Sequence, residues 1–220
     1  MMAATDPTQR PVGELGSAML DQWRRVADGV AATTDWQAPT RLAGWTAQTL
    51  LGHLVVVGEA IPRTLRETPT SAEPISVYDV FSGAPSRAAD NDSRAREFAA
   101  GADADELVAR LHAAVAAASD AVEAVDSAAV LPTRFGALPV ADFLVHRVVE
   151  GVVHGLDLPH HVPPDETALL IASAALRTLL QRRRPDLVAQ VPADPVVWLE
   201  GATGRAPPPT DLREALPLLA

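Results

Sequence analysis

The sequence predicts an all-α protein, and three observations support this. The 19 prolines of the 220-residue chain leave five long proline-free windows, at 12–38, 40–61, 86–131, 140–158 and 165–184. Because proline costs ~3 kcal/mol inside a helix, these windows are where helices can form. Apolar residues recur in them every three or four positions, as in helices, rather than alternating as in strands. The composition, 48% hydrophobic and 21% charged, excludes a disordered chain.

The first two windows each predict one helix. The first helix ends before residues 33–35, and its apolar face is formed by Leu15, Met19, Trp23, Val26 and Val30. In the second window Thr46 is suited to cap the helix, and Pro62 marks a kink or a late boundary. Its apolar stripe is formed by Leu50, Leu54, Val57, Ile61 and Leu65.

Residues 66–102 predict a long connection, with only a short helix around 94–100, because Pro, Gly, Ser, Asp and Asn are frequent there. A third helix begins at Asp103. Its apolar and small residues recur at intervals of four and three, which is typical of a helix packed in a bundle. These residues are Leu107, Leu111, Ala114, Ala118, Ala121 and Val125.

Two more helices follow. Pro139 suits the first position of a helix that runs from Val140 to Leu158 and is ended by Pro159. A fifth helix is expected from Glu166 to Arg183. We interpret the basic run 182–184 as a solvated helix end that favours the helix dipole, rather than as an anion site. An irregular proline-rich tail follows, with a short element around 196–199.

The fourth helix carries a polar stripe on an otherwise apolar surface. Its members recur at intervals of four, three, four and three residues: Phe143, Arg147, Glu150, His154 and Asp157. This stripe occupies the seam expected to face other helices. An isolated charge buried there costs many kcal/mol, so the stripe must be paired, hydrogen-bonded or metal-bound.

Glu150 and His154 are the sharpest candidates for a metal site. Their i, i+4 spacing places a carboxylate and an imidazole ~5–6 Å apart on one helix face, within reach of one metal ion. His53, between Leu50 and Leu54, points into the same interior from the second helix. Two structural alternatives stay open: His53 as a core histidine bonded to a backbone carbonyl, and Glu150 in a purely structural ion pair.

Glycines interrupt both helices beside these candidates, at Gly52, Gly58, Gly151 and Gly155. Each costs ~1 kcal/mol relative to alanine in a helix interior. Close approach of another helix, or room for a ligand, would explain them. The alternative is the bias of a GC-rich genome, which would also explain why every basic residue is arginine.

The other histidines are weaker candidates. His146 lies one turn before Glu150, but it is left out of the metal triad because it could equally face solvent beside Arg147. His160 and His161 follow a proline in a loop, and His112 is expected to be exposed. The tryptophans at 23, 36 and 45 are expected to wall the core rather than to form a stacking platform.

Charge and cysteine content exclude several classes of function. The chain has 18 basic and 28 acidic residues, a net charge of −10, which disfavours a nucleic-acid partner. It has no cysteine, so any thiol that it uses must be brought in. No apolar run approaches the ~18 residues of a membrane span, and the first residues lack the apolar core of a secretory signal. The expected location is the cytoplasm, without a membrane partner.

Two segments carry a family resemblance. One runs from Trp36 through Gly44-Trp45-Thr46 to Leu50-Leu51-Gly52-His53-Leu54. The other extends over residues 146–158, where Glu150-Gly-Val-Val-His154 is preceded by His146-Arg147 and followed by Gly-Leu-Asp157-Leu158. In this order they resemble the mycothiol-dependent maleylpyruvate isomerase group of the DinB-like superfamily, over about residues 10–160.

The resemblance implies a DinB-like four-helix bundle at residues 1–164, with residues 165–220 as a helical extension packed on it. It also implies a divalent metal, usually zinc, held by His53, Glu150 and His154. The group uses mycothiol, a low-molecular-weight thiol of actinobacteria, as cosubstrate. Three protein ligands leave an open coordination position, where a bound thiol loses its proton.

The expected function is therefore a metal-dependent enzyme that activates mycothiol to isomerise a small electrophile or to be transferred to it. A non-catalytic binding protein, with His146 closing the metal shell, is one alternative. A metal-assisted hydrolase with Asp157 as its base is another, although Asp157 could equally orient His154.

Substrate binding and assembly are less determined by the sequence. The best-known isomerase of the group has a larger C-terminal domain and binds the substrate carboxylates with arginines. Arg87, Arg94 and Arg147 are available here for this role, but the sequence assigns it to none of them. A homodimer is compatible with a bundle of this size.

Overall fold

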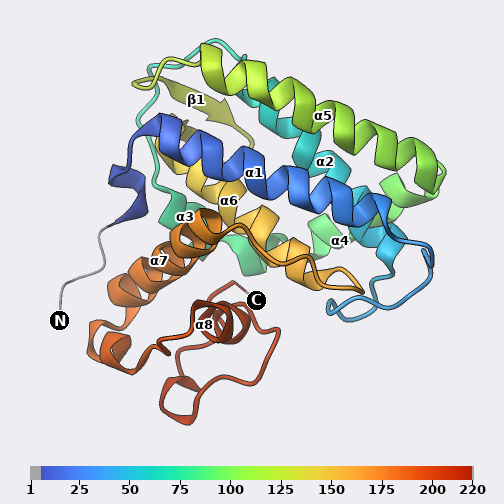
Figure 1. Cartoon of the computed structure of the whole chain (residues 1–220). Coiled ribbons are helices and arrows are strands. Elements are labelled where there is room, and N and C mark those ends of the chain that lie inside the picture. The colour runs from blue at the N-terminus through green and yellow to red at the C-terminus, as the bar shows by residue number, and fades with distance from the viewer. Residues whose placement is uncertain (1–5, 220) are drawn as a thin grey trace.

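Four long helices form the bundle that the sequence predicts, in a computed structural model that describes residues 6–219. They are α1 (Val12–Ala31), α2 (Ala47–Leu65), α5 (Ala104–Ala124) and α6 (Val140–Asp157). Helix α1 packs against both α5 and α6, and α2 packs against α5 and, less extensively, against α6 (Figure 1). The facing sides of these helices form the core of the protein.

Local sequence explains where these helices begin. The Thr46 hydroxyl accepts the Thr49 N–H at 3.3 Å, and the Asp103 carboxylate accepts the Glu106 N–H at 2.8 Å, so each N-cap satisfies a free backbone donor. The predicted apolar stripes of α1 and α2 are buried throughout. Helix α2 continues through Pro62 to Leu65.

The connection between α2 and α5 is more helical than expected. It contains α3 (Val77–Ser82) and a 17-residue helix, α4 (Ala84–Ala100), where we predicted only a short helix at 94–100. Only Ala95 and Ala99 of α4 are buried, so this helix has almost no apolar stripe to read. It packs against α2, largely by close backbone approach.

A small hairpin precedes α6. Strands β1 (Val130–Thr133) and β2 (Gly136–Pro139) pair antiparallel, an addition to the otherwise all-α fold that the sequence did not indicate. Each strand has four residues and contains a proline, too short a pattern to recognise. Pro139 closes β2 and caps α6 instead of starting it as predicted. The hairpin turn carries Arg134 and Phe135.

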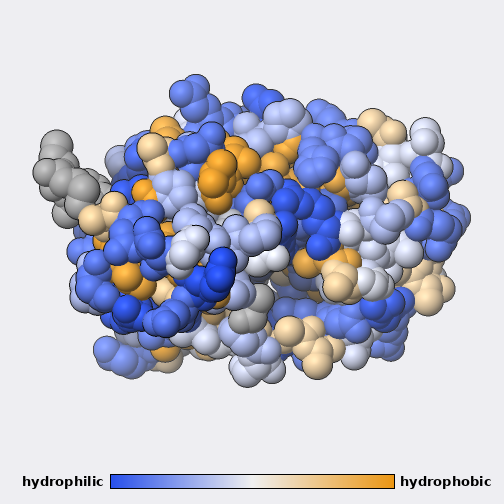
Figure 2. Space-filling model, turned by 90° about the horizontal axis from the view of Figure 1, so that it is seen from below, coloured by the Kyte–Doolittle hydropathy of each residue, from blue (hydrophilic) through white to orange (hydrophobic). Residues whose placement is uncertain are grey.

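The C-terminal residues form α7 (Glu166–Arg183) and α8 (Pro195–Ala202). Short 3-10 turns lie at Pro7–Gln9, Pro185–Gln190 and Thr210–Leu212. Helix α7 begins and ends where predicted and packs against α6 and α1, whereas α8 packs on α7. Viewed from the α8 side, the surface is largely hydrophilic with small separate apolar groups (Figure 2). The division of the chain at residue 164 stays a prediction.

The four glycines that interrupt α2 and α6 allow close packing between helices. A Cβ on Gly52 would lie 2.8 Å from the Ala95 carbonyl oxygen of α4, and one on Gly58 would lie 3.0 Å from Leu111 of α5. A Cβ on Gly151 would lie 3.0 Å from atoms of Gln22 and Trp23 on α1.

Among residues 6–219, no helix has the length and apolar character needed to cross a bilayer.

Candidate metal centre

His53 of α2 and two residues of α6, Glu150 and His154, converge in the bundle interior. One potential ligand atom from each lies within 4.8 Å of the others. Glu150 Oε2 is 3.5 Å from His53 Nε2 and 3.4 Å from His154 Nε2. Ligands bound at ~2 Å in a tetrahedral zinc site lie roughly 3.3 Å apart, so these separations suit a shared metal ion.

Two atoms of this group lack partners. His53 Nε2 and Glu150 Oε2 are both inaccessible to solvent and neither makes a hydrogen bond. Most buried polar atoms are hydrogen-bonded, and an unsatisfied one costs free energy. A lone pair from each of the two residues therefore points to a common space that a cation would fill.

His146 is a third histidine at this site, which the sequence reasoning left out of the triad. It is 5% exposed rather than facing solvent, and its Nε2 lies 3.4 Å from Glu150 Oε1. Its ring centroid is 5.7 Å from that of Phe81 and 5.3 Å from that of Phe135. The i, i+4 spacing to Glu150 was the available sequence signal. His146 is not among the residues whose ligand atoms cluster together.

Burial and neighbouring charges set the protonation states. Burial alone would raise the pKa of Glu150, but the three facing imidazoles bring it well below its usual value. Burial lowers the pKa of both His53 and His146, which keeps these rings neutral. Burial also opposes charge on His154, yet hydrogen bonding to Asp157 and the Glu150 charge raise its pKa to about 9. An ionised carboxylate and neutral imidazoles are the forms that bind metals, so Glu150 and His53 already have the suitable form, and a metal bound here would displace the Nε2 proton of His154.

Asp157 contacts His154 and is not among the residues that line the cavity. Its carboxylate is fully buried, lies 2.9 Å from His154 Nδ1 and pairs with Arg205 through two contacts of 3.0 and 2.8 Å. Burial would raise the pKa of Asp157, but His154 and Arg205 lower it to about 2. The role as a catalytic base, one of two considered from the sequence, does not fit this enclosed ion pair.

The histidine and glutamate side chains line a cavity of about 600 Å³. Six arginines also line it: Arg63, Arg87, Arg94, Arg134, Arg147 and Arg205. The three arginines considered from the sequence are thus brought together, and three others join them. Arg63 comes from the last turns of α2, Arg134 from the hairpin turn and Arg205 from the segment after α8. These three were missed because their approach to the cavity depends on tertiary packing.

Arg147 is the most unusual of these arginines. It is 6% exposed, its Nε has no hydrogen-bond partner, and burial lowers its pKa to about 10. Its guanidinium lies 5.0 Å from the centre of the Phe143 ring. Among residues 6–219 it forms no ion pair with a carboxylate. A buried cation without a carboxylate partner is unfavourable, so an anion in the cavity would stabilise it.

Aromatic side chains form part of the cavity wall. Trp45 lies with its ring centre 5.5 Å from that of His53, and its indole N–H donates to Asp92 at 2.6 Å. Trp23 is fully buried in the core as predicted, whereas Trp45 is only partly buried and lines the cavity. Trp36 is also partly buried and packs against the core.

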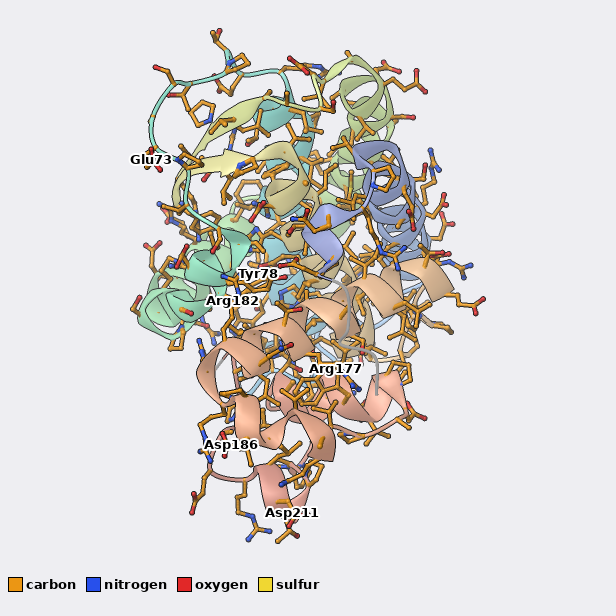
Figure 3. The ribbon with its side chains drawn as sticks, turned by 90° about the vertical axis from the view of Figure 1, so that its left-hand side faces the viewer. Glu73, Tyr78, Arg177, Arg182, Asp186 and Asp211 are labelled. Carbon is orange, nitrogen blue, oxygen red and sulfur yellow. The ribbon has the colours of Figure 1, made fainter. Side chains whose placement is uncertain are left out.

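The remaining candidates lie elsewhere. His112, His160 and His161 are exposed. In the basic run, Arg182 lies over the Tyr78 ring, 3.9 Å from its centre, where α7 meets α3 (Figure 3). Arg183 donates to the Leu218 carbonyl and the Ser82 hydroxyl, and Arg184 pairs with Asp186. This run anchors neighbouring segments as well as ending α7.

Comparisons with known proteins agree with this architecture. The family described as mycothiol maleylpyruvate isomerase N-terminal domain matches residues 18–159. No curated protein sequence matches the chain. A mutant crystal structure of mycothiol-dependent maleylpyruvate isomerase has a TM-score of 0.56, and another structure of that isomerase has 0.54. Both are 15% identical over 80% of this chain and 71% of theirs, a similarity that shows the shared fold.

Proposed function

The chain belongs to the mycothiol maleylpyruvate isomerase N-terminal domain family, and from this membership we propose that it is a metal-dependent isomerase that uses mycothiol as cosubstrate. Its substrate is a small anionic electrophile of the maleylpyruvate type. In the transferase variant of this chemistry, the thiol stays bonded to the electrophile instead of being eliminated from it.

One observation carries the proposal: the convergence of His53, Glu150 and His154 on the wall of the cavity. These three residues would hold a divalent metal. The unpaired His53 Nε2 and Glu150 Oε2 support this assignment, as does the donor set of two imidazoles and one carboxylate, which is typical of zinc sites with an open position.

A thiol must come from outside, because the chain has no cysteine. When bound, a divalent metal supplies positive charge that favours the thiolate form of a ligating thiol. The His53 and Trp45 rings would flank the thiol on one side. The cavity, about 600 Å³ in volume, accommodates the bulky polar portion of the thiol together with a small electrophile.

The arginines account for the choice of an anionic electrophile. Arg147 is buried without a carboxylate partner, and Arg87 and Arg134 both lie over the Phe135 ring, each 4.8 Å from its centre. Carboxylates of a substrate would pair with these guanidinium groups and be oriented by them. Such positioning holds the reacting double bond near the thiol.

The alternatives find less support. A hydrolase needs a base facing the cavity, and Asp157 is enclosed by His154 and Arg205. A closed metal shell would require His146 as the fourth ligand, but its Nε2 lies on the opposite carboxylate oxygen of Glu150 from the other two imidazoles. Activation of a thiol by the metal requires an open coordination position, which three protein ligands leave.

Metal content tests the site. We expect one divalent ion per chain in protein purified with metal available, and loss of that ion in His53→Ala, Glu150→Ala and His154→Ala. Elemental analysis and calorimetric titration with mycothiol measure both properties on the same samples. His112→Ala is the matched control, because that histidine is exposed on α5. Metal-free wild-type protein, or variants that retain the ion, would contradict the triad.

Turnover tests the reaction. With mycothiol and maleylpyruvate, we expect isomerisation that Arg147→Met reduces by about 10²-fold or more, because an anion would lose its buried partner. The variant keeps its metal, since Arg147 is not among the clustered ligands. Arg25→Met, an exposed arginine of α1, is the control. Stable thiol adducts instead of an isomer would indicate a transferase, and unchanged turnover in Arg147→Met would contradict the anion site.

A further inference from the structure

We propose that Arg205, which lies beyond the family match, is a positioning residue of the metal centre: it holds Asp157, and Asp157 in turn fixes the orientation of His154. The inference rests on the proposed function, because it takes His154 to be a metal ligand. It adds a part of the C-terminal extension to a site otherwise built from α2 and α6.

The contacts form a continuous chain. Arg205 Nε lies 3.0 Å from Asp157 Oδ1, and its NH2 group lies 2.8 Å from Oδ2, which is the two-point pairing that a guanidinium makes with a carboxylate. The same Oδ2 lies 2.9 Å from His154 Nδ1. On the other side of the ring, His154 Nε2 faces Glu150.

The local fold delivers Arg205 to this place. Helix α8 ends in a turn where Gly204 adopts a φ of 76°, a left-handed conformation that glycine tolerates best. The Arg205 N–H then donates to the Glu200 carbonyl at 2.8 Å. Arg41, in the loop before α2, donates to the Arg205 carbonyl at 3.0 Å and pairs with Glu200 at 2.5 Å. These two contacts stabilise the same turn.

The arrangement has a clear physical purpose. A fully buried carboxylate is unfavourable unless it is paired, and Arg205 provides two donors in fixed geometry. A fixed carboxylate accepts a hydrogen bond from the Nδ1–H of His154, so the Nε2 lone pair faces the metal position. Without Arg205, Asp157 would lose half of its partners, and both the ring orientation and the tautomer of His154 would be less strongly set.

Metal binding and docking of the α8 turn should therefore be linked. If the docked Arg205 raises the affinity for a metal, the metal must strengthen docking by the same factor. Amide hydrogen exchange around residues 199–206 should slow when zinc binds. No residue of this turn is among the proposed ligands, so direct coordination does not explain that effect.

The test measures zinc affinity by competition with a chelator, without any substrate. We expect Arg205→Met and Asp157→Asn each to weaken binding by about 10- to 100-fold, the range found when the residue behind a ligating histidine is lost. Arg205→Lys should recover part of the loss, since lysine keeps the charge but not the two-point pairing. Arg213→Met, an exposed arginine of the same segment, is the control.

The double variant Arg205→Met/Asp157→Asn separates this role from a merely structural one. The double variant removes both charges of the Arg205–Asp157 pair, so neither is left buried without its partner. It therefore keeps the proposal testable if one of the single variants fails to fold. We expect its affinity to match that of Asp157→Asn alone, because Arg205 acts through Asp157. In metal-free protein at a pH above the His154 pKa, where the ring is neutral, nitrogen chemical shifts should show the proton on Nδ1 in wild-type protein and a mixture of tautomers in Arg205→Met.

Wild-type zinc affinity in Arg205→Met, or losses that add in the double variant, would overturn the role of Arg205 while leaving the triad intact. Retention of zinc by wild-type protein and its loss in His53→Ala would show that the proposed function stands in that case. If wild-type protein binds no zinc at all, the proposed function and this inference are both overturned.

Discussion

At the scale of single residues, the polar stripe of α6 is made tolerable by specific partners. Asp157 is paired twice, and the Trp23 indole donates to the Arg147 carbonyl at 2.9 Å. Arg147 keeps its buried charge without a carboxylate, and Glu150 keeps an unpaired oxygen. Unsatisfied groups persist where they serve binding, at a cost in stability.

Asp142, in the first turn of α6, gives a prediction about pH. It accepts the Val77 N–H at 2.7 Å, and burial, reinforced by the Asp6 charge, raises its pKa. A folded-state pKa above the unfolded value means that protonated Asp142 favours folding, a contribution lost as the pH rises through the folded-state pKa. Asp142→Asn keeps the acceptor without the charge, so it should stabilise the protein more at pH ~7.5 than at pH ~4.5.

Urea unfolding of wild-type and Asp142→Asn protein at both pH values measures this difference. Changes common to both proteins, including those of the histidines, cancel in the comparison. A stability difference that does not vary with pH would show that the Asp142 carboxyl is not perturbed.

At the scale of helices, glycine sets how closely α6 approaches α1. Gln22 donates to the Gly151 carbonyl at 3.0 Å, beside the indole contact of Trp23 with α6. Atoms of both side chains lie 3.0 Å from the position that a Cβ of residue 151 would take. Gly151 lowers the intrinsic helix stability of α6, but it permits two buried hydrogen bonds between α1 and α6.

Gly151→Ala should therefore destabilise the protein. Overpacking against side chains that are held by hydrogen bonds costs ~1–3 kcal/mol, more than the ~1 kcal/mol gained in helix propensity. Gly13→Ala in α1 is the matched control, because no atom lies within 4 Å of its added Cβ. It should be neutral or stabilising by up to ~1 kcal/mol. Thermal or urea unfolding measures both, and a stabilised Gly151→Ala would refute the close approach.

At the scale of the whole molecule, the C-terminal residues complete both the core and the cavity. Helix α7 buries Ile171, Leu176 and Leu180 against the bundle side, and Arg205 and Leu219 line the cavity. The predicted division at residue 164 therefore describes the order of elements along the chain, and we propose that the two parts fold as one unit.

Truncation after residue 164 tests this unity. The shortened chain would expose the faces of α6 and α1 that α7 covers, so we expect it to lose the cooperative unfolding transition of the full chain. Circular dichroism during heating detects the loss. A truncated protein that melts cooperatively at the wild-type temperature would show an independent bundle instead.

The sequence was informative wherever a local pattern was sufficient. The five helices were expected from proline spacing and apolar periodicity, and α7 spans about the residues expected for the fifth helix. The convergence of His53 with Glu150 and His154 was expected from burial of both helix faces and from the family resemblance. Their metal binding stays a proposal. Helix α4 and the hairpin were missed, because a mostly polar helix and two four-residue strands have no recognisable apolar periodicity.

The sequence by itself determined the five periodic helices and the polar residues that share the inner face of α6, because both follow from periodicity along one segment. Only the tertiary structure decided what surrounds them. His146 became buried between Phe81 and Phe135, Arg134 arrived on a hairpin, and Arg205 reached Asp157 across 48 residues of chain. Such contacts depend on how separate elements pack, and spacing within one element does not encode that.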